Sequence, residues 1–283
     1  MQIIHTVTEL RQWSRQQRAN NKTIGLVPTL GALHAGHASL IRAACKECEA
    51  VAVSIFVNPT QFGPNEDFTR YPRTFEADCK LAEAEGADVI FAPQVEEIYP
   101  DGTITFVEVE GLSDRLDGAS RPGHFRGVAT VVSKLFIAAE PDRAYFGQKD
   151  AAQVAVLRRM TTDLRFGVEI VVCPIIRDAD GLALSSRNIY LSAEERQQAL
   201  TLSRAIRRIE ALFTNGVRDA AVLRSAAQEV FASEPAVHID YIELVDWSTL
   251  LPVDFATPRT LFAVAAHVGA TRLIDNTILS EPA

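Results

Sequence analysis

The stretch IGLVPTLGALHAGHASLIRAACKEC, residues 24–48, decides the fold of this chain. It opens with an apolar run, IGLV (24–27), which is typical of a buried strand. A turn with two glycines and two histidines follows, PTLGALHAGH (28–37). An amphipathic run, ASLIRAACKEC (38–48), comes next. The stretch therefore predicts a strand that turns into a helix, with both histidines at the junction.

The same alternation of strand and helix continues through the first part of the chain. Candidate strands are 23–29, 50–58, 87–93, 143–147 and 168–176, and helical patterns separate them, namely TELRQWSRQQRA, HASLIRAACKECE, TFEADCKLAEAEG and DAAQVAVLRRMTTDL. Gly86 is well placed to end the third helix. Alternating β and α segments predict an α/β fold with a doubly wound parallel sheet. Ligands of such sheets bind at the carboxyl ends of the strands.

The pattern changes after residue 180. Helical stretches at 193–214 and 218–232 are followed by two β-rich runs, VHIDYIELVD and RTLFAVAAHVGATRLIDN. Ser192 and Glu195 form a capping-box pattern at the start of the first helix. We expect two domains, 1–176 and 177–283, the second a smaller α+β domain with an antiparallel sheet.

Composition narrows the class of protein. The chain has 283 residues, 47% of them hydrophobic, and a net charge of 28 − 36 = −8, which disfavours general nucleic-acid binding. A basic stripe on the first helix (Arg11, Arg15, Arg18, Lys22) is interpreted as a solvated face. Charges interrupt every long apolar run, and the N-terminus lacks the layout of a signal peptide, so no membrane association is expected. Four cysteines in a chain this long do not suggest a disulfide framework, and a cytoplasmic location is expected.

The two histidines of the turn have a chemical interpretation. Gly31 and Gly36 have P-loop spacing, but His37 and Ala38 stand where a P-loop needs Lys and Ser or Thr. A helix N-terminus still favours an anion, and His34 and His37 could donate to the same phosphate. Two alternatives stay open: structural histidines, and a zinc site completed by the nearby CKEC. The stripe of Leu40, Ile41, Ala44, Cys45 and Cys48 argues that these cysteines face the core.

Three further motifs carry polar groups at predicted strand ends or loops. FGQKD (146–150) offers Lys149 for phosphate and Asp150 for a ribose, with Gln153 one turn on. GLALSSRNIYLS (181–192) has the composition of a phosphate clamp. VNPTQF (57–62) places Gln61 over the sheet edge, where an amide orients a substrate. Taken alone, Lys149 and Asp150 could be a surface pair, and GLALSSRNIYLS could be an ordinary polar loop between domains.

The four motifs together resemble the pantoate–β-alanine ligase family of the HxGH nucleotidyltransferase superfamily. The resemblance covers nearly the whole chain and includes SIFVNPTQF, YPRTFEADC, EIYPDG, RPGHFRGVATVVSKLF, FGQKD and DGLALSSRN. It implies a Rossmann-like fold whose smaller domain closes over the active site. It also implies a ligase that condenses (R)-pantoate with β-alanine through a pantoyl adenylate, releasing pyrophosphate and AMP.

The family's roles transfer to matching positions. The resemblance assigns ATP contacts to Leu30, Gly31, Ala32, Leu33, His34, Ala35, Gly36, His37, Gly147, Gln148, Lys149, Asp150, Ile176, Leu184, Ser185, Ser186 and Arg187. Catalytic roles fall to His34, His37 and Lys149, with His37 as proton donor. Gln61 is assigned to pantoate and β-alanine, and Gln153 to pantoate. No protein metal site is implied, because ATP phosphates would hold Mg²⁺. Family members are commonly homodimers.

The sequence departs from the family at three positions, and other functions compete. Leu30, Thr60 and Gln148 stand where the family usually has Met, Met and Glu. An adenylyltransferase would release pyrophosphate but never AMP. A non-catalytic ATP-binding regulator would show no turnover. A metal hydrolase would need His34 and His37 as ligands.

Overall fold

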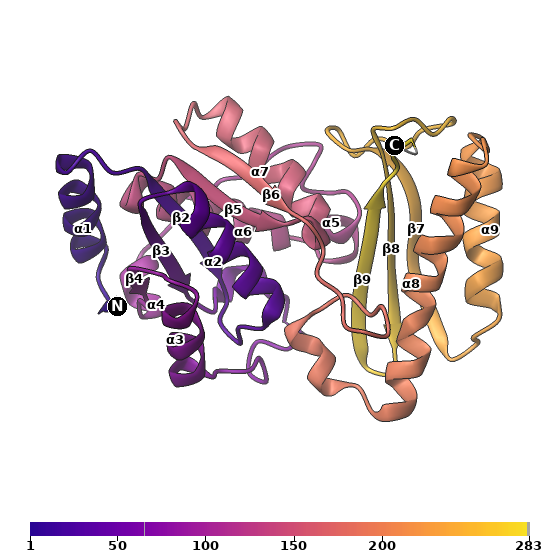
Figure 1. Cartoon of the computed structure of the whole chain (residues 1–283), viewed down its shortest axis with the longest axis horizontal. Helices are drawn as coiled ribbons and strands as arrows, with labels where there is room; N and C mark the ends of the chain where they lie inside the picture. The colour runs from indigo at the N-terminus through magenta and orange to yellow at the C-terminus, as the bar shows by residue number, and fades with distance from the viewer. Residues whose placement is uncertain (65, 282–283) are drawn as a thin grey trace. The chain divides into compact units, whose positions relative to one another are not determined.

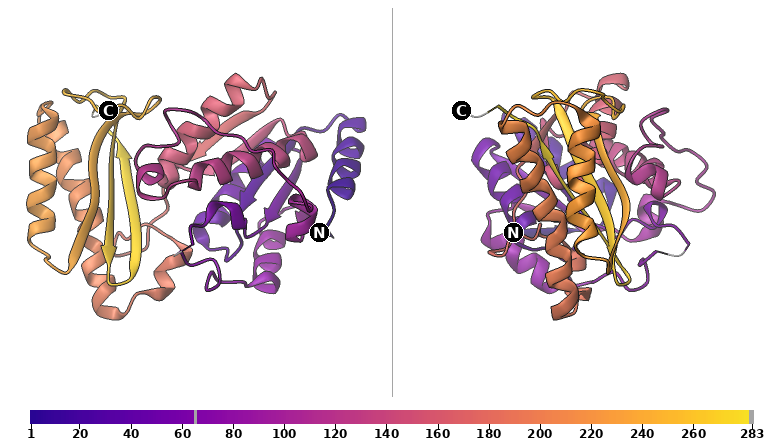
Figure 2. Two further views of the ribbon diagram at one scale, coloured as in Figure 1. Left: turned by 180° about the vertical axis from the view of Figure 1, so that it is seen from behind. Right: turned by 90° about the vertical axis from the view of Figure 1, so that its right-hand side faces the viewer.

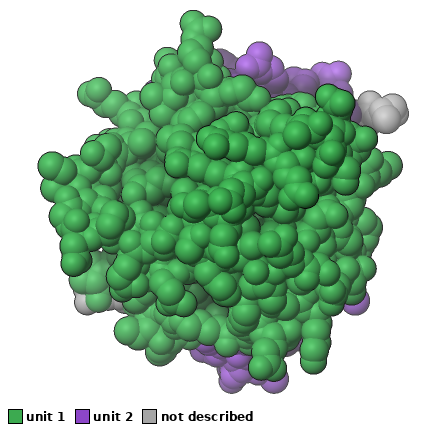
Figure 3. Space-filling view, turned by 90° about the vertical axis from the view of Figure 1, so that its left-hand side faces the viewer, with its two compact units in different colours: residues 1–148, 156–174 green, residues 149–155, 175–283 purple. Residues whose placement is uncertain are grey.

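A computed structural model describes residues 1–64 and 66–281. The chain forms two compact units, coloured in Figure 3. Unit 1 contains Met1–Gln148 and Val156–Pro174, and unit 2 contains Lys149–Ala155 and the chain from Ile175 onward. The sequence placed its boundary after residue 176. The assignment of Lys149–Ala155 to unit 2 has no counterpart in the sequence analysis.

The sheet of unit 1 is parallel throughout. Its strands, in the order β1-β4-β3-β2-β5-β6, are β1 (Gln2–Ile4), β4 (Val89–Phe91), β3 (Ala50–Ile55), β2 (Ile24–Thr29), β5 (Arg143–Gly147) and β6 (Glu169–Cys173). Chain order runs outward from β2 through β3 to β4 in one direction and from β5 to β6 in the other, and β1 is added beyond β4. The α/β doubly wound prediction is therefore confirmed, and the switch point lies between β2 and β5.

Helices connect these parallel strands. They are α1 (Val7–Ala19), α2 (Ala35–Glu47), α3 (Phe75–Ala84), α4 (Val95–Ile98), α5 (Asp117–Ser120), α6 (His124–Ala139) and α7 (Ala151–Asp163). Short 3₁₀ turns are η1 (Pro59–Gln61) and η2 (Gln148–Asp150). In Figure 1, α2 and α3 lie on the near face of the sheet, while α1 packs against α6. Gly86 follows α3 with a φ of +96°, as predicted.

Several elements of unit 1 have no counterpart among the predictions, including β1, α4, α5 and α6. β1 is three residues long, and it pairs with β4 at the sheet edge. α4 and α5 are four residues long, about one helical turn each. α6 is mostly buried, yet Arg126, Thr130 and Lys134 recur every four residues along it, which is a helical spacing. The short elements are therefore settled by packing partners, whereas the pattern of α6 is present in the sequence.

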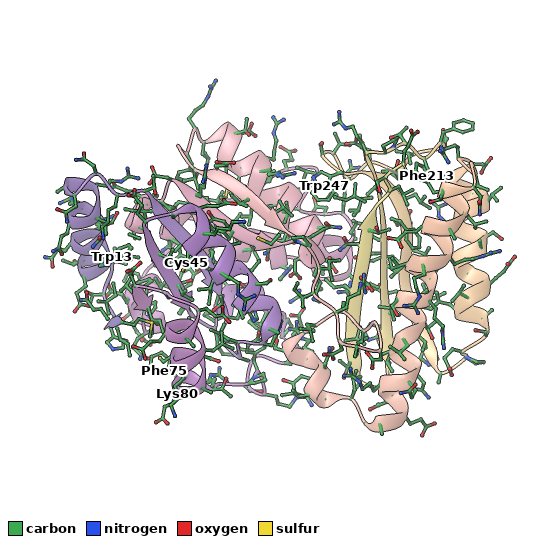
Figure 4. All side chains as sticks on the ribbon, viewed as in Figure 1. Trp13, Cys45, Phe75, Lys80, Phe213 and Trp247 are labelled. Carbon is green, nitrogen blue, oxygen red and sulfur yellow. The ribbon has the colours of Figure 1, made fainter. Side chains whose placement is uncertain are left out.

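Unit 2 is the smaller α+β arrangement that the sequence predicted. Strands β7 (Val237–Asp246), β8 (Thr260–Val268) and β9 (Thr271–Ile278) form an antiparallel sheet in that order. One face is covered by α8 (Ala193–Thr214) and α9 (Ala220–Ala232), visible in the right-hand view of Figure 2. Phe213, labelled in Figure 4, is 1% exposed in the core they share. The predicted capping box joins Ser192 and Glu195 at the start of α8.

The fold makes β2 and β5 neighbouring parallel strands. Gly25 and Leu26 of β2 are in register with Arg143 and Ala144 of β5. The histidine turn therefore leaves the sheet beside the strand that leads into FGQKD. No helix within residues 1–64 and 66–281 is long and apolar enough to cross a membrane.

Candidate active site

The histidine turn has an unusual backbone. β2 ends at Thr29, and the next residues include two in the left-handed region, Gly31 at φ +81° and Ala32 at φ +50°. A side chain at Gly31 would meet Asp78 and Ile55 at 3.1 Å, so glycine suits both the conformation and the space. Successive N–H groups in such a turn can point into one concavity that suits a negative charge.

The point toward which these N–H groups turn is filled by a carboxylate. Asp78, 2% exposed on α3, accepts hydrogen bonds from the N–H groups of Ala32 at 3.0 Å and Leu33 at 2.8 Å. It also accepts one from the Thr74 hydroxyl at 3.0 Å. A side chain of the protein itself thus occupies the anion position of this turn. The N–H groups of Ala32 and Leu33 are therefore already engaged by a carboxylate of the protein.

Replacing Asp78 tests this role. We expect Asp78→Ala to lower the free energy of unfolding by about 2 kcal/mol, because two half-buried N–H groups would lose their acceptor. Urea unfolding would measure the change. Glu76→Ala is the matched control, since Glu76 is an exposed acid of the same helix turn. Equal stability of the two variants would contradict the prediction.

The two imidazoles are oriented by backbone N–H groups. His34 is the N-cap of α2, and its Nδ1 accepts from the Gly36 N–H at 3.1 Å. His37 Nδ1 accepts from the His34 N–H at 3.3 Å, and the ring centroids lie 4.2 Å apart. A nitrogen that accepts carries no proton, so each neutral ring holds its hydrogen on Nε2. Both rings are therefore N–H donors beside the positive end of a helix.

Gln61 is held in one orientation by a buried hydrogen-bond chain. The amide oxygen of Asn58 accepts from the hydroxyls of Tyr99 and Thr60, both at 2.9 Å. The amide nitrogen of Asn58 then donates to Gln61 Oε1 at 3.0 Å. Burial raises the pKa of Tyr99, which keeps its hydroxyl protonated as a donor. The Gln61 amide can therefore offer its NH₂ group to a ligand.

The main chain of Gln61 is fixed as well. Its carbonyl accepts from His124 Nδ1 at 2.8 Å and from the Arg121 guanidinium at 3.3 Å. Arg121 is paired with Glu66 at 2.6 Å. Gly127 on α6 has no side chain to separate η1 from the helix, since a Cβ there would lie 2.3 Å from the Thr60 carbonyl. Gln61 is thus rigidly placed at the end of β3.

His124 makes the stability of this region depend on pH. Burial and the Arg121 charge lower the pKa of His124 from 6.5 to about 4, although Gln61, Asp117 and Glu66 act in the opposite direction. Below pH 6.5 the unfolded chain takes up a proton that the folded chain does not. The contribution of the neutral His124 ring to the free energy of unfolding is therefore complete above pH 6.5. It is lost as the pH falls from there through the pKa of His124 in the folded protein. We expect the free energy of unfolding to fall by about 3 kcal/mol over this range.

The measurement is urea unfolding between pH 7 and about pH 4. His124→Gln should remove about 3 kcal/mol of the change in the free energy of unfolding over this pH range. His238→Gln is the control, because His238 is exposed and should leave the slope as it is. An identical slope in the wild type and His124→Gln would overturn the assignment.

Unit 2 carries GLALSSRNIYLS together with Lys149, Asp150 and Gln153, while Phe146, Gly147 and Gln148 of FGQKD belong to unit 1. Lys149 Nζ lies 3.6 Å from Asp150 Oδ1 in η2, and Gln153 follows on the first turn of α7. Ser185 begins η3 (Ser186–Tyr190), its hydroxyl accepting from the Arg187 N–H at 3.2 Å. The Ile176 carbonyl accepts from the Leu184 N–H at 2.9 Å. This hydrogen bond joins the two sides of the 176–187 loop, a pairing that the sequence did not indicate.

The zinc site and the metal hydrolase, the two alternatives that depend on a metal, would each need a set of protein ligands. Among residues 1–64 and 66–281, no group of three or more His, Cys, Asp or Glu side chains is placed to hold a metal ion. The four cysteines are free thiols. Cys48 is buried and Cys45 is half-buried, on the apolar side of α2 as the sequence indicated.

Several positioning residues escaped the sequence analysis. They are Asp78, Tyr99, Arg121 and His124. The signal was present, because each lies in a quoted family motif: YPRTFEADC, EIYPDG or RPGHFRGV. What the motifs did not indicate was which side chain supports which.

The fold and these sites define a class of protein: a doubly wound α/β protein with N–H donors at the switch point and a separate α+β unit. A model of the Pantoate-beta-alanine ligase family matches residues 2–278. The chain is 61% identical to the pantothenate synthetase of Acidobacterium capsulatum, over 99% of this chain and 98% of that one. It is 56% identical to that of Thermotoga neapolitana, over 99% and 100%. The chain belongs to the pantoate–β-alanine ligase family.

Solved structures agree with this family. The crystal structure of pantothenate synthetase from Thermus thermophilus matches with a TM-score of 0.93 and 45% identity, over 99% of this chain and 100% of that one. That of pantoate-beta-alanine ligase from Francisella tularensis matches with 0.81 and 33%, over 98% and 97%. The latter is described as complexed with beta-gamma ATP and beta-alanine.

Proposed function

We propose that this protein condenses (R)-pantoate with β-alanine, using ATP and forming pantothenate, AMP and pyrophosphate through a pantoyl adenylate. Membership of the family over residues 2–278 supports the reaction. The observation that carries the chemistry is the pair His34 and His37, whose Nε2–H groups stand at the start of α2. Such donors suit the negative charge that develops on a phosphate.

The first half-reaction activates the carboxylate. A carboxylate does not acylate an amine directly, because its leaving group is poor. A pantoate carboxylate oxygen attacks the α-phosphorus of ATP, and the bond to the pyrophosphate oxygen breaks. His34, His37 and Lys149 would stabilise the charge on the phosphates, with His37 placing a proton near the leaving oxygen.

The second half-reaction forms the amide. The neutral amine of β-alanine attacks the pantoyl carbonyl, the bond to AMP breaks, and the amine nitrogen releases a proton. Gln61 would donate its NH₂ group to pantoate and contact β-alanine, and Gln153 would contact pantoate. Holding the two reactants in contact is the main source of rate in such a step.

The proposed ATP contacts come from four segments. They are Leu30–His37, Gly147–Asp150, Ile176 and Leu184–Arg187. Mg²⁺ would arrive on the ATP phosphates as part of that substrate. A cytoplasmic location and a homodimeric state complete the proposal.

Omission of substrates tests the function. We expect AMP from ATP and Mg²⁺ only when both pantoate and β-alanine are present, and pantoate-dependent exchange of pyrophosphate into ATP without β-alanine. Chromatography of nucleotides and labelled pyrophosphate would measure these products. Pyrophosphate without AMP in every combination would indicate an adenylyltransferase. ATP binding without turnover would indicate a regulator.

A further inference from the structure

Strand β9 carries two adjacent buried polar residues that the proposed mechanism does not use. Asp275 is 2% exposed and Asn276 is 3% exposed. β9 forms an edge of its sheet, paired with β8 alone. Buried polar groups at a sheet edge need partners. Asp275 is paired with Arg177, which lies between two segments assigned to ATP, and Asn276 is bonded to Lys149 within a third.

Asp275 holds the 176–187 loop. Its carboxylate accepts two hydrogen bonds from the Arg177 guanidinium, at 2.6 and 2.9 Å. The Arg177 guanidinium also donates to the Gly181 carbonyl at 3.2 Å. The backbone of Arg177 forms an isolated antiparallel β-bridge with Ala183. A paired guanidinium neutralises the carboxylate, so Asp275 brings no uncompensated negative charge to this loop.

Asn276 holds the segment that contains Lys149. Its amide nitrogen donates to the Lys149 carbonyl at 2.8 Å. Lys149 has a long, flexible side chain, and its reach depends on where its backbone is fixed. A small pocket of unit 2 is lined by Lys149, Ser185 and Asp275 together, which shows that the three segments meet.

We propose that Asp275 and Asn276 are positioning residues. They hold Lys149 and the 184–187 loop in fixed positions from which both can bind the triphosphate of ATP. The inference rests on the proposed function of those two segments. One strand thereby holds both phosphate-binding segments. Neither Asp275 nor Asn276 touches a substrate, and each acts through its partner.

A double-mutant cycle tests the role of Asn276. We expect Asn276→Ala to lower kcat of pantoate-dependent pyrophosphate exchange by about 10- to 100-fold, because a small misplacement of a catalytic group costs about that much. In a Lys149→Ala background the same change should have almost no further effect. Equal losses in both backgrounds would overturn the proposal, since Asn276 would then act independently of Lys149.

Controls separate folding from function. Thr277→Val removes a neighbouring hydrogen bond, the one to Glu210 at 2.7 Å, and should leave kcat unchanged. Asn276→Asp keeps the side-chain volume but replaces the donor with a carboxylate oxygen, and should lose as much activity as the alanine variant. Thermal unfolding would establish that each variant is folded.

The outcomes distinguish the two proposals. A wild type without pantoate-dependent exchange would refute the proposed function. An active wild type whose kcat is matched by folded Asn276→Ala and Asn276→Asp would refute the positioning role alone.

Discussion

Replacing His37 with alanine should lower the rate of pantoate-dependent pyrophosphate exchange by about 10²- to 10³-fold, the usual cost of removing one donor from an anion-stabilising site. His37 supplies an Nε2–H group whose direction is set by the His34 N–H on Nδ1. The loss should fall on kcat more than on KM for ATP, because the charge develops in the transition state. Steady-state exchange kinetics would measure both constants.

His37 also stabilises its helix, so the experiment needs a variant that separates the two roles. His37 is the third residue of α2 and completes a capping box with His34. Glutamine is a usual residue at this position of a capping box. We therefore expect His37→Gln to keep the melting temperature of the wild type while kcat falls as in His37→Ala. Full activity in His37→Gln would exclude the imidazole from the chemistry.

Replacing Lys149 with alanine should cause a loss of similar size, about 10²- to 10³-fold in kcat for the same exchange. The side chain is 20% exposed and lies 3.6 Å from Asp150 in η2. A cation that meets phosphate oxygens as their charge redistributes stabilises the transition state, and alanine leaves that charge unopposed. The measurement is exchange rate against ATP concentration.

Lys80 provides the matched control for Lys149. Lys80 is exposed on α3 and is labelled in Figure 4. Lys80→Ala removes the same side chain and the same charge and should leave the exchange rate unchanged. An active Lys149→Ala enzyme, or an equally damaged Lys80→Ala enzyme, would contradict the role of Lys149.

Much of the fold follows from local pattern. Continuous apolar runs predicted β2 to β6 to within a few residues, because strands covered on both faces leave no room for polar side chains. Amphipathic runs predicted α1, α2, α3 and α7, because a helix at the surface of a protein buries an apolar side and exposes a polar one. α6 was not predicted although Arg126, Thr130 and Lys134 recur along it at helical spacing, and β1 was not predicted because three residues cannot carry a pattern.

The sequence by itself determined the histidine turn, the parallel sheet, the C-terminal α+β unit and the family. These depend on residue types at short spacing, which a linear chain displays directly. Only the tertiary structure decided which side chains support the site: Asp78 for the turn, the Tyr99–Asn58 chain for Gln61, and Asn276 for Lys149. The physical reason is that a buried polar group must find a partner, and the partner comes from whichever distant segment the packing brings within about 3 Å.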